Sequence, residues 1–335
     1  MKLWQKVFVP ALFVGVVAGG APQSALAQAA IKIDGSSTVF PISEAFAEEF
    51  QISKRGKVRV TVGMSGTGGG FKKFCRGETD MSNASRPIST EEMEACRKAG
   101  IKYLELPVAF DALTVVINPN NNWVKGNVLT VADLKKMWEP AAQGRINTWK
   151  QVRAEWPAEK LMLFGPGADS GTFDYFTEAV NGKSKASRGD FTASEDDNTL
   201  VQGVVNNKSA LGYFGFAYYA AHKDKLRAVA IDGGKGPVVP SIENVINGTY
   251  SPLSRPLFVY VRESSAARPE VREFVQFMMR QGSELVSEVG YVPLPQSAYD
   301  LAWKHFDNKK LGTVFGGHNQ VGITIDELLS MEAKL

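Results

Sequence analysis

The chain has 335 residues, of which 44% are hydrophobic and 22% charged, an ordinary composition for a globular protein. At about 150 residues per domain, this length predicts two domains. The 38 Lys and Arg residues and 35 Asp and Glu residues leave a net charge of +3. This balance excludes a protein built to follow a nucleic-acid backbone, so we expect no nucleic-acid partner.

The first 27 residues have the pattern of a secretory signal peptide. Lys2 and Lys6 precede an apolar run, and residues 25–27 (Ala-Leu-Ala) supply the A-x-A cleavage pattern. An uncleaved membrane anchor is the alternative, but the run is short and Pro10 interrupts it. No later stretch approaches about 18 consecutive apolar residues. The sequence therefore predicts export, with residues 1–27 removed.

Short apolar runs alternate with helical patterns along the rest of the chain, which predicts α/β lobes. Expected strands cover residues 30–33, 57–62, 112–117, 161–164, 210–216 and 256–261, with a further one from Met81. Expected helices begin near Phe40, Phe71, Ser89, Thr130, Phe173, Asn198 and Pro269. No linker rich in Pro, Gly or Ser separates two lobes. We therefore expect the strands 112–117 and 256–261 to pass between them.

Three loops of Ser, Thr and Gly each join a predicted strand to a predicted helix, at residues 35–38, 65–69 and 169–172. A helix N-terminus exposes unpaired N–H groups and about half an elementary positive charge, which suits an anion. In any one loop the hydroxyl could simply cap its own helix. Three such loops in one chain favour a shared oxyanion.

Arg86 is the one cation inside a similar loop, between Ser85 and Pro87. Its planar fork suits bidentate binding of an anion, and an ordinary surface arginine is the alternative.

Other glycine-loop chemistries do not fit these residues. The run ending at Gly70 lacks the Gly-Lys-Ser/Thr of a P-loop, and Phe71 stands where a dinucleotide fingerprint needs Gly. Thr67 stands where a nucleophile elbow needs its second Gly. The histidines and cysteines form no metal-ligand spacing, so we expect no metal, no cofactor and no enzymatic activity. Export favours a disulfide between Cys75 and Cys96, with two buried thiols as the alternative.

Four motifs occur in order: Asp-Gly-Ser-Ser-Thr-Val-Phe-Pro at 34–41, Ser-Gly-Thr-Gly-Gly-Gly-Phe at 65–71, Ala-Ser-Arg-Pro-Ile at 84–88, and Asp-Ser-Gly-Thr-Phe-Asp-Tyr-Phe at 169–176. Together they resemble the periplasmic phosphate-binding proteins of bacterial phosphate-specific ABC transporters. The resemblance covers essentially the whole chain after residue 27. It implies a type II periplasmic binding protein fold, with two α/β lobes joined by crossing strands and the ligand in the cleft.

The resemblance also implies domain limits and site residues. Lobe one would comprise residues 28–114 and 258–335, and lobe two residues 115–257. The phosphate ligands would be Ser37, Thr38, the backbone of Val39, Ser65 or Thr67, Ser85, Arg86, Ser170, Gly171 and Thr172. The implied partners are inorganic phosphate and an inner-membrane permease, and we expect a monomer in the periplasm.

This chain departs from the family pattern at two positions. Well-known members have Asp where it has Arg86, and Arg where it has Pro166. We expect Arg86 to supply the cation, and Asp169 to accept the proton that phosphate retains or to pair with Arg86. Sulfate carries no proton at neutral pH, so such an acceptor favours phosphate. The alternatives are a receptor for sulfate, molybdate or an organic phosphate, or an exported phosphatase.

Overall fold

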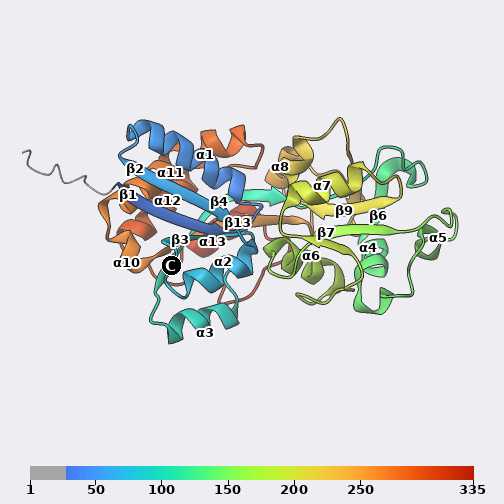
Figure 1. Ribbon diagram of the computed structural model, residues 1–335, viewed down its shortest axis with the longest axis horizontal. Helices are drawn as coiled ribbons and strands as arrows, with labels where there is room; N and C mark the ends of the chain where they lie inside the picture. Colours follow the sequence, from blue (N-terminus) through green and yellow to red (C-terminus); the bar gives the residue numbers. More distant parts are fainter. Residues whose placement is uncertain (1–27) are drawn as a thin grey trace, which may run out of the picture.

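The computed structural model describes residues 28–335, which form two α/β lobes side by side (Figure 1). The expected signal peptide, residues 1–27, lies outside the described residues. The first lobe contains a five-stranded sheet of order β2-β1-β3-β13-β4, and the second contains one of order β10-β5-β9-β7-β8. A three-stranded sheet, β12-β11-β6, completes the second lobe. Within residues 28–335, no helix is both long and apolar enough to span a membrane.

In the first lobe, parallel and antiparallel strands share one sheet covered by helices. Its strands are β1 (Ala29–Gly35), β2 (Val58–Met64), β3 (Met81–Ala84), β4 (Tyr103–Ala112) and β13 (Ser254–Arg262). Its helices are α1 (Phe40–Ser53), α2 (Gly66–Phe74), α3 (Thr90–Lys98), α10 (Glu263–Ala266), α11 (Pro269–Glu288), α12 (Gln296–Asp307) and α13 (Ile325–Glu332). β4 is buried at all ten positions, because it pairs with β13 and packs against α12.

The second lobe has shorter elements. Its main sheet consists of β5 (Thr114–Ile117), β7 (Met162–Pro166), β8 (Thr192–Ser194), β9 (Ala210–Phe214) and β10 (Arg227–Ala228), and the small sheet of β6 (Val128–Thr130), β11 (Ala230–Asp232) and β12 (Pro237–Val238). Its helices are α4 (Val131–Trp138), α5 (Trp149–Val152), α6 (Gly171–Asn181), α7 (Asp197–Val205), α8 (Phe216–Ala220) and α9 (Ile242–Ile246), with 3₁₀ turns η1 (Lys125–Asn127) and η2 (Pro140–Ala142).

The chain passes between the two main sheets twice, so the first lobe is built from two segments of the chain, one before and one after the second lobe. It leaves the first sheet at Ala112 and enters β5 at Thr114, and it returns at Ser254. The first passage falls within the strand expected at 112–117. The second precedes the strand expected at 256–261, since β13 pairs along its length with β4 in the first sheet.

The glycine run was expected to be a loop up to Phe71, but α2 begins at Gly66. Glycine is a poor helix former, so packing must explain its presence there. A Cβ added to Gly70 would lie 2.5 Å from the Cα of Gly35, and one on Gly66 would lie 2.5 Å from the Asp169 carbonyl oxygen. The glycines therefore allow the first turns of α2 to approach β1 and the second lobe closely.

A predicted helix cap and a predicted strand end each differ from the structure by two residues. Asp196, rather than Asn198, caps α7, and its side chain accepts a hydrogen bond from the Asn198 N–H. β9 ends at Phe214 instead of continuing to 216.

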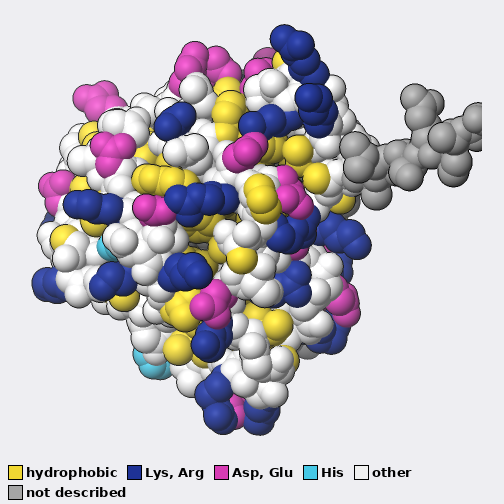
Figure 2. Space-filling model, turned by 90° about the vertical axis from the view of Figure 1, so that its left-hand side faces the viewer, with side chains coloured by type: hydrophobic (Ala, Val, Ile, Leu, Met, Phe, Trp, Pro, Cys, Tyr) yellow, Lys and Arg dark blue, Asp and Glu magenta, His cyan; other side chains and the backbone are white. Residues whose placement is uncertain are grey.

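The outer end of the first lobe carries charges of both signs. Figure 2 shows Lys and Arg side chains interspersed there with Asp, Glu and small hydrophobic areas. This mixture agrees with the nearly balanced composition and offers no single-sign surface for a polyanion.

A disulfide joins Cys75, directly after α2, to Cys96 on α3. The bridge that the sequence favoured is therefore present. It links two helices of the first lobe and leaves the first turn of α2 untouched.

Replacing the two cysteines together (Cys75→Ala, Cys96→Ala) is expected to lower the free energy of unfolding by about 3 kcal/mol, because the bridge closes a loop between residues 21 apart in sequence. Denaturant unfolding of the oxidised parent, the reduced parent and the variant measures this. Ligand affinity should stay close to that of the parent. Coincident unfolding curves would contradict the prediction.

Candidate functional site

The four motifs meet where the two lobes touch. The hydroxyl oxygens of Thr38, before α1, and Thr172, in the first turn of α6, are 2.9 Å apart. Thr67 Oγ1, in the first turn of α2, lies 3.2 Å from Ser85 Oγ and accepts from the Ser85 N–H at 3.1 Å. A Cβ on Gly171 would lie 2.5 Å from Thr67 Oγ1 and 2.6 Å from Ser85 Oγ. We call the buried side chains of Thr38, Thr67, Ser85 and Thr172 the hydroxyl cluster.

A buried arginine that the sequence reasoning missed, Arg255 at the start of β13, contacts this cluster. Its Nη2 donates to Thr172 Oγ1 at 2.8 Å and to Thr38 Oγ1 at 3.3 Å, and its Nη1 donates to the Ser85 carbonyl at 3.1 Å. Arg255 is 0% exposed and pairs with Asp111, which lies opposite it on β4 (Nη2–Oδ2 2.9 Å). A buried guanidinium with one carboxylate partner can also bind an anion. The sequence signal that could have revealed Arg255 is a charged residue directly before the apolar strand expected at 256–261.

The remaining loop residues divide between contact with the cluster and local roles. Ser37 accepts a hydrogen bond from Tyr218 through its carbonyl, at 2.9 Å. Val39 is buried as the N-cap of α1, and Ser170 caps α6 by accepting from the Thr172 N–H at 3.1 Å. The Ser65 hydroxyl donates to Asp34 instead of facing the cluster. Of the two hydroxyls of the second motif, Thr67 is therefore the one in the hydroxyl cluster.

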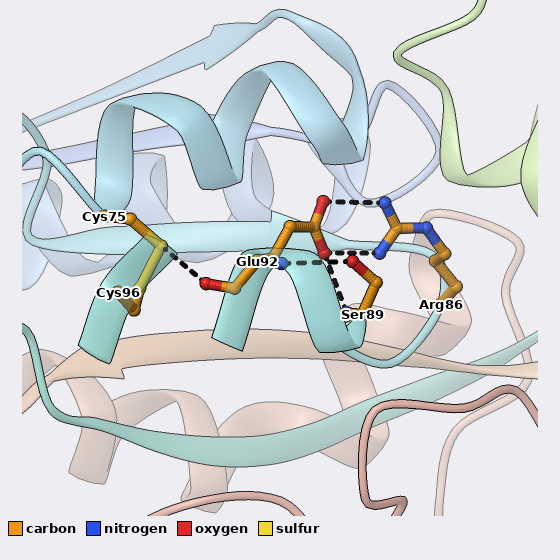
Figure 3. Close-up of a disulfide and its surroundings, with 5 residues drawn as sticks. All are labelled: Cys75, Arg86, Ser89, Glu92 and Cys96. Atoms are coloured by element: carbon orange, nitrogen blue, oxygen red, sulfur yellow. Dashed lines mark hydrogen bonds and ion pairs between the residues drawn. A yellow bond between two sulfur atoms is a disulfide. The ribbon is translucent and has the colours of Figure 1, made fainter. Parts of the chain in front are cut away.

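Arg86 makes different contacts from those expected. Its Nη1 and Nη2 each donate to one oxygen of Glu92 at 2.8 Å, as Figure 3 shows, and its Nε donates to Asp174 Oδ2 at 2.7 Å. Burial acts to lower the pKa of Arg86, but Glu92 and Asp174 raise it above its ordinary value. Two carboxylates thus occupy the fork that was expected to hold the anion. The physical reason is that Glu92 is the third residue of α3, where its capping box turns the carboxylate back toward Arg86.

Asp169 also differs from expectation, since it does not pair with Arg86. Its carboxylate accepts from Lys72 Nζ at 2.7 and 3.0 Å, in an exposed position. Its carbonyl accepts from the Gly68 N–H at 2.7 Å, a contact between the lobes. The second-lobe partner of Arg86 is Asp174.

A second acidic residue, Asp197, was not found from the sequence. It is the first residue of α7 and fully buried, and neither carboxylate oxygen has a hydrogen-bond partner among residues 28–335. Burial raises the pKa of Asp197 to about 8; the positive charge of Arg255 opposes this rise, and the negative charges of Asp111, Asp196 and Glu195 add to it. The charge of Arg255 thus acts on Asp197. Its sequence context, an acidic helix start, resembles ordinary capping.

Among residues 28–335, no group of three or more His, Cys, Asp or Glu side chains is placed to hold a metal ion.

Two lobes that enclose buried hydroxyls, helix N-termini and a guanidinium define a two-lobed solute-binding protein. A family model described as a PBP superfamily domain matches residues 20–281. The protein SphX of Synechococcus elongatus is 54% identical over 313 residues, 92% of this chain and 91% of the relative. The phosphate-binding protein PstS of Staphylococcus saprophyticus is 37% identical over 308 residues, 89% of this chain and 92% of the relative.

Two solved structures of proteins described as phosphate-binding or phosphate-transporter proteins also resemble this chain. A proposed phosphate-binding protein from Planctomyces limnophilus has 49% identity and a TM-score of 0.61, covering 84% of this chain and 98% of its own. A proposed phosphate ABC transporter substrate-binding protein from Clostridium perfringens, solved with bound phosphate, has 26% identity and a TM-score of 0.66, covering 79% of this chain and all of its own. The chain therefore belongs to the PBP superfamily and, within it, to the family of these PstS and SphX relatives. The resemblance drawn from the four motifs is confirmed.

Proposed function

We propose that the protein binds inorganic phosphate in the periplasm and delivers it to an inner-membrane ABC permease. The observation that carries this proposal is the hydroxyl cluster, which draws on both lobes and in which Arg255 donates to the hydroxyls of Thr38 and Thr172. The PstS relative is named for phosphate binding, and the Clostridium perfringens structure holds phosphate. Export by residues 1–27, a monomeric state and a transport role without catalysis belong to the same proposal.

An oxyanion that leaves water must replace its lost hydrogen bonds to water with hydrogen bonds from the protein. The proposed donors are the hydroxyl cluster, the backbone N–H groups at the starts of α1 and α6, and Arg255. From the expected ligand set this keeps Ser37, Thr38, Val39, Thr67, Ser85, Ser170, Gly171 and Thr172. The cation role expected of Arg86 passes to Arg255, and the acceptor role expected of Asp169 passes to Asp197.

The ligand would lie between the lobe of the first main sheet, which β13 rejoins at Ser254, and the lobe of the second main sheet, which β5 enters at Thr114. The limits implied by the resemblance, 114/115 and 257/258, lie one and four residues later in the sequence. Donors from both lobes then require a hinge motion for entry and release. The contacts between Thr38 and Thr172 and between Gly68 and Asp169 correspond to the closed arrangement.

Calorimetry on protein freed of bound ligand tests the function. Phosphate should bind with measurable heat and more tightly than sulfate or molybdate. Absence of phosphate binding, or tighter sulfate binding, would contradict the proposal. Turnover of a phosphate monoester above a buffer blank would instead support the exported phosphatase.

Replacing Arg255 with Lys keeps the charge opposite Asp111 but loses the planar fork. In that fork Nη2 donates to Thr38 and Thr172, and Nη1 donates to the Ser85 carbonyl. Phosphate binding is expected to weaken by about 2–4 kcal/mol, the size of one or two charge-assisted hydrogen bonds. Calorimetry measures the affinity, and thermal unfolding shows that the variant is folded. The matched control is Arg262→Lys on the same strand, where the side chain pairs with Asp80 outside the site. A folded Arg255→Lys protein with parental affinity would remove Arg255 from the site.

The raised pKa of Asp197 predicts how anion selectivity changes with pH. Below the pKa of about 8 the carboxyl carries a proton that it can donate to either oxyanion; above it, only an oxyanion with its own proton can bond the carboxylate. Sulfate affinity should therefore fall by about tenfold per pH unit above that pKa. Phosphate affinity should hold, because monohydrogen phosphate keeps its last proton in this range.

Competition titrations of sulfate against phosphate between neutral and mildly alkaline pH measure this selectivity. In Asp197→Asn the amide does not titrate, so the ratio of the two affinities should no longer change with pH. If sulfate binding weakens equally at alkaline pH in the parent and in the variant, then a group other than Asp197 distinguishes the protonated anion from the unprotonated one.

A further inference from the structure

Two ion pairs join the lobes within residues 28–335, and they differ sharply in burial. Arg86, directly after β3, pairs with Asp174 on α6 at 2.7 Å, and the two side chains are 5% and 2% exposed. Lys72 on α2 pairs with Asp169 at 2.7 Å, and these side chains are 62% and 42% exposed. An exposed pair contributes little because water competes for both charges. The buried pair is the one able to affect how the lobes close.

The buried pair is asymmetric in a way that suits opening and closing. Glu92 holds Arg86 through two hydrogen bonds from within the same lobe. Glu92 is fixed in turn, since its carboxylate accepts from the Ser89 N–H at 2.8 Å (Figure 3). Its carbonyl oxygen lies 3.4 Å from Cys75 Sγ of the disulfide. When the lobes separate, Arg86 keeps this partner. Only Asp174 exchanges its ion pair for water.

Closure of the lobes therefore has two opposing electrostatic effects on the Asp174 carboxylate. Burial raises the pKa of Asp174, and the positive charge of Arg86 acts to lower it. Burying a paired charge recovers only part of the lost hydration, so the pair alone gives little preference for the closed state. Once a ligand holds the lobes together, breaking the pair would leave a buried carboxylate uncompensated, which is costly.

Asp174 also stands on the helix turn that serves the site. It is the fourth residue of α6, its N–H donates to the Ser170 carbonyl at 3.1 Å, and Thr172 lies two residues earlier. Fixing Asp174 against the first lobe thus fixes the turn that presents Gly171 and Thr172. The ion pair and the ligand would act on the same turn.

We propose that Arg86 and Asp174 are positioning residues that hold the lobes closed over bound phosphate and slow its release, without contacting it. The inference rests on the proposed function for its ligand. It gives Arg86 a role at the site through Asp174 and α6.

The test compares Asp174→Asn with the matched control Lys72→Gln, which breaks the exposed pair. Stopped-flow fluorescence measures phosphate association and release, and thermal unfolding is followed without ligand. Asp174→Asn should release phosphate about tenfold faster or more, with association and ligand-free unfolding unchanged. Lys72→Gln should stay within about twofold of the parent. Parental release from Asp174→Asn, or a rate change shared equally by both variants, would overturn the proposal.

Two further measurements keep the outcome decisive. Arg86→Lys retains a positive charge beside Glu92 but loses the Nε contact with Asp174, so it should reproduce the faster release if Asp174→Asn fails to fold. A spectroscopic distance between labels on the two lobes should show that Asp174→Asn shifts the ligand-free ensemble no further open than the parent, but closes less completely with phosphate. If the parent itself binds no phosphate, the proposed function fails; the same measurements with the oxyanion that does bind then test the ion pair separately.

Discussion

The structure depends on a full positive charge that is held out of water where the lobes meet. Burying a guanidinium is unfavourable unless a countercharge and several acceptors surround it. Arg255 has both: Asp111 opposite it on the neighbouring strand, and the oxygens of Thr38, Ser85 and Thr172. These three acceptors come from three separate motifs, so satisfying one side chain brings distant parts of the chain together.

The charge balance around the site follows from this constraint. Asp111 neutralises Arg255, and two carboxylates more than neutralise Arg86. An entering oxyanion therefore finds little uncompensated positive charge, and dipoles must provide much of its binding. Hydroxyls and helix N-termini provide such dipoles in fixed orientations. Recognition of this kind depends on hydrogen-bond geometry and on protons. The buried Asp197, whose carboxylate has no hydrogen-bond partner among residues 28–335, is the group proposed to sense the proton of the anion.

The sequence predicted what depends on local order: the alternation of strands and helices, the disulfide, and the loops that carry Thr38, Thr67, Ser85 and Thr172. It could not show which charged residue contacts the hydroxyl cluster, because that depends on contacts between distant segments. Arg86 lies inside a site motif, yet its fork is taken by Glu92 six residues later and by Asp174 across the interface. Arg255 lies in no recognised motif and reaches the hydroxyl cluster only because β13 returns beside β4. Asp197 gave no signal, since an acid at a helix start ordinarily caps it.

The glycines of the second motif are another feature whose structure the sequence alone could not predict. They were expected to form a loop, whereas the structure places them in a helix, where a Cβ on Gly66 or Gly70 would lie only 2.5 Å from an atom of a neighbouring segment. At Gly66 the backbone of the other lobe, and at Gly171 its hydroxyls, lie too close for a Cβ, and this approach allows the Gly68 N–H to donate to the Asp169 carbonyl. The first turn of α6 then has two neighbours in the opposite lobe: the hydroxyl cluster at Thr172 and Arg86 at Asp174. A rigid helical turn cannot satisfy one of these contacts while it is displaced from the other. The hydroxyl cluster and the ion pair between Arg86 and Asp174 are therefore linked through a few residues of backbone, which is the physical basis of the proposed effect of the pair on phosphate release.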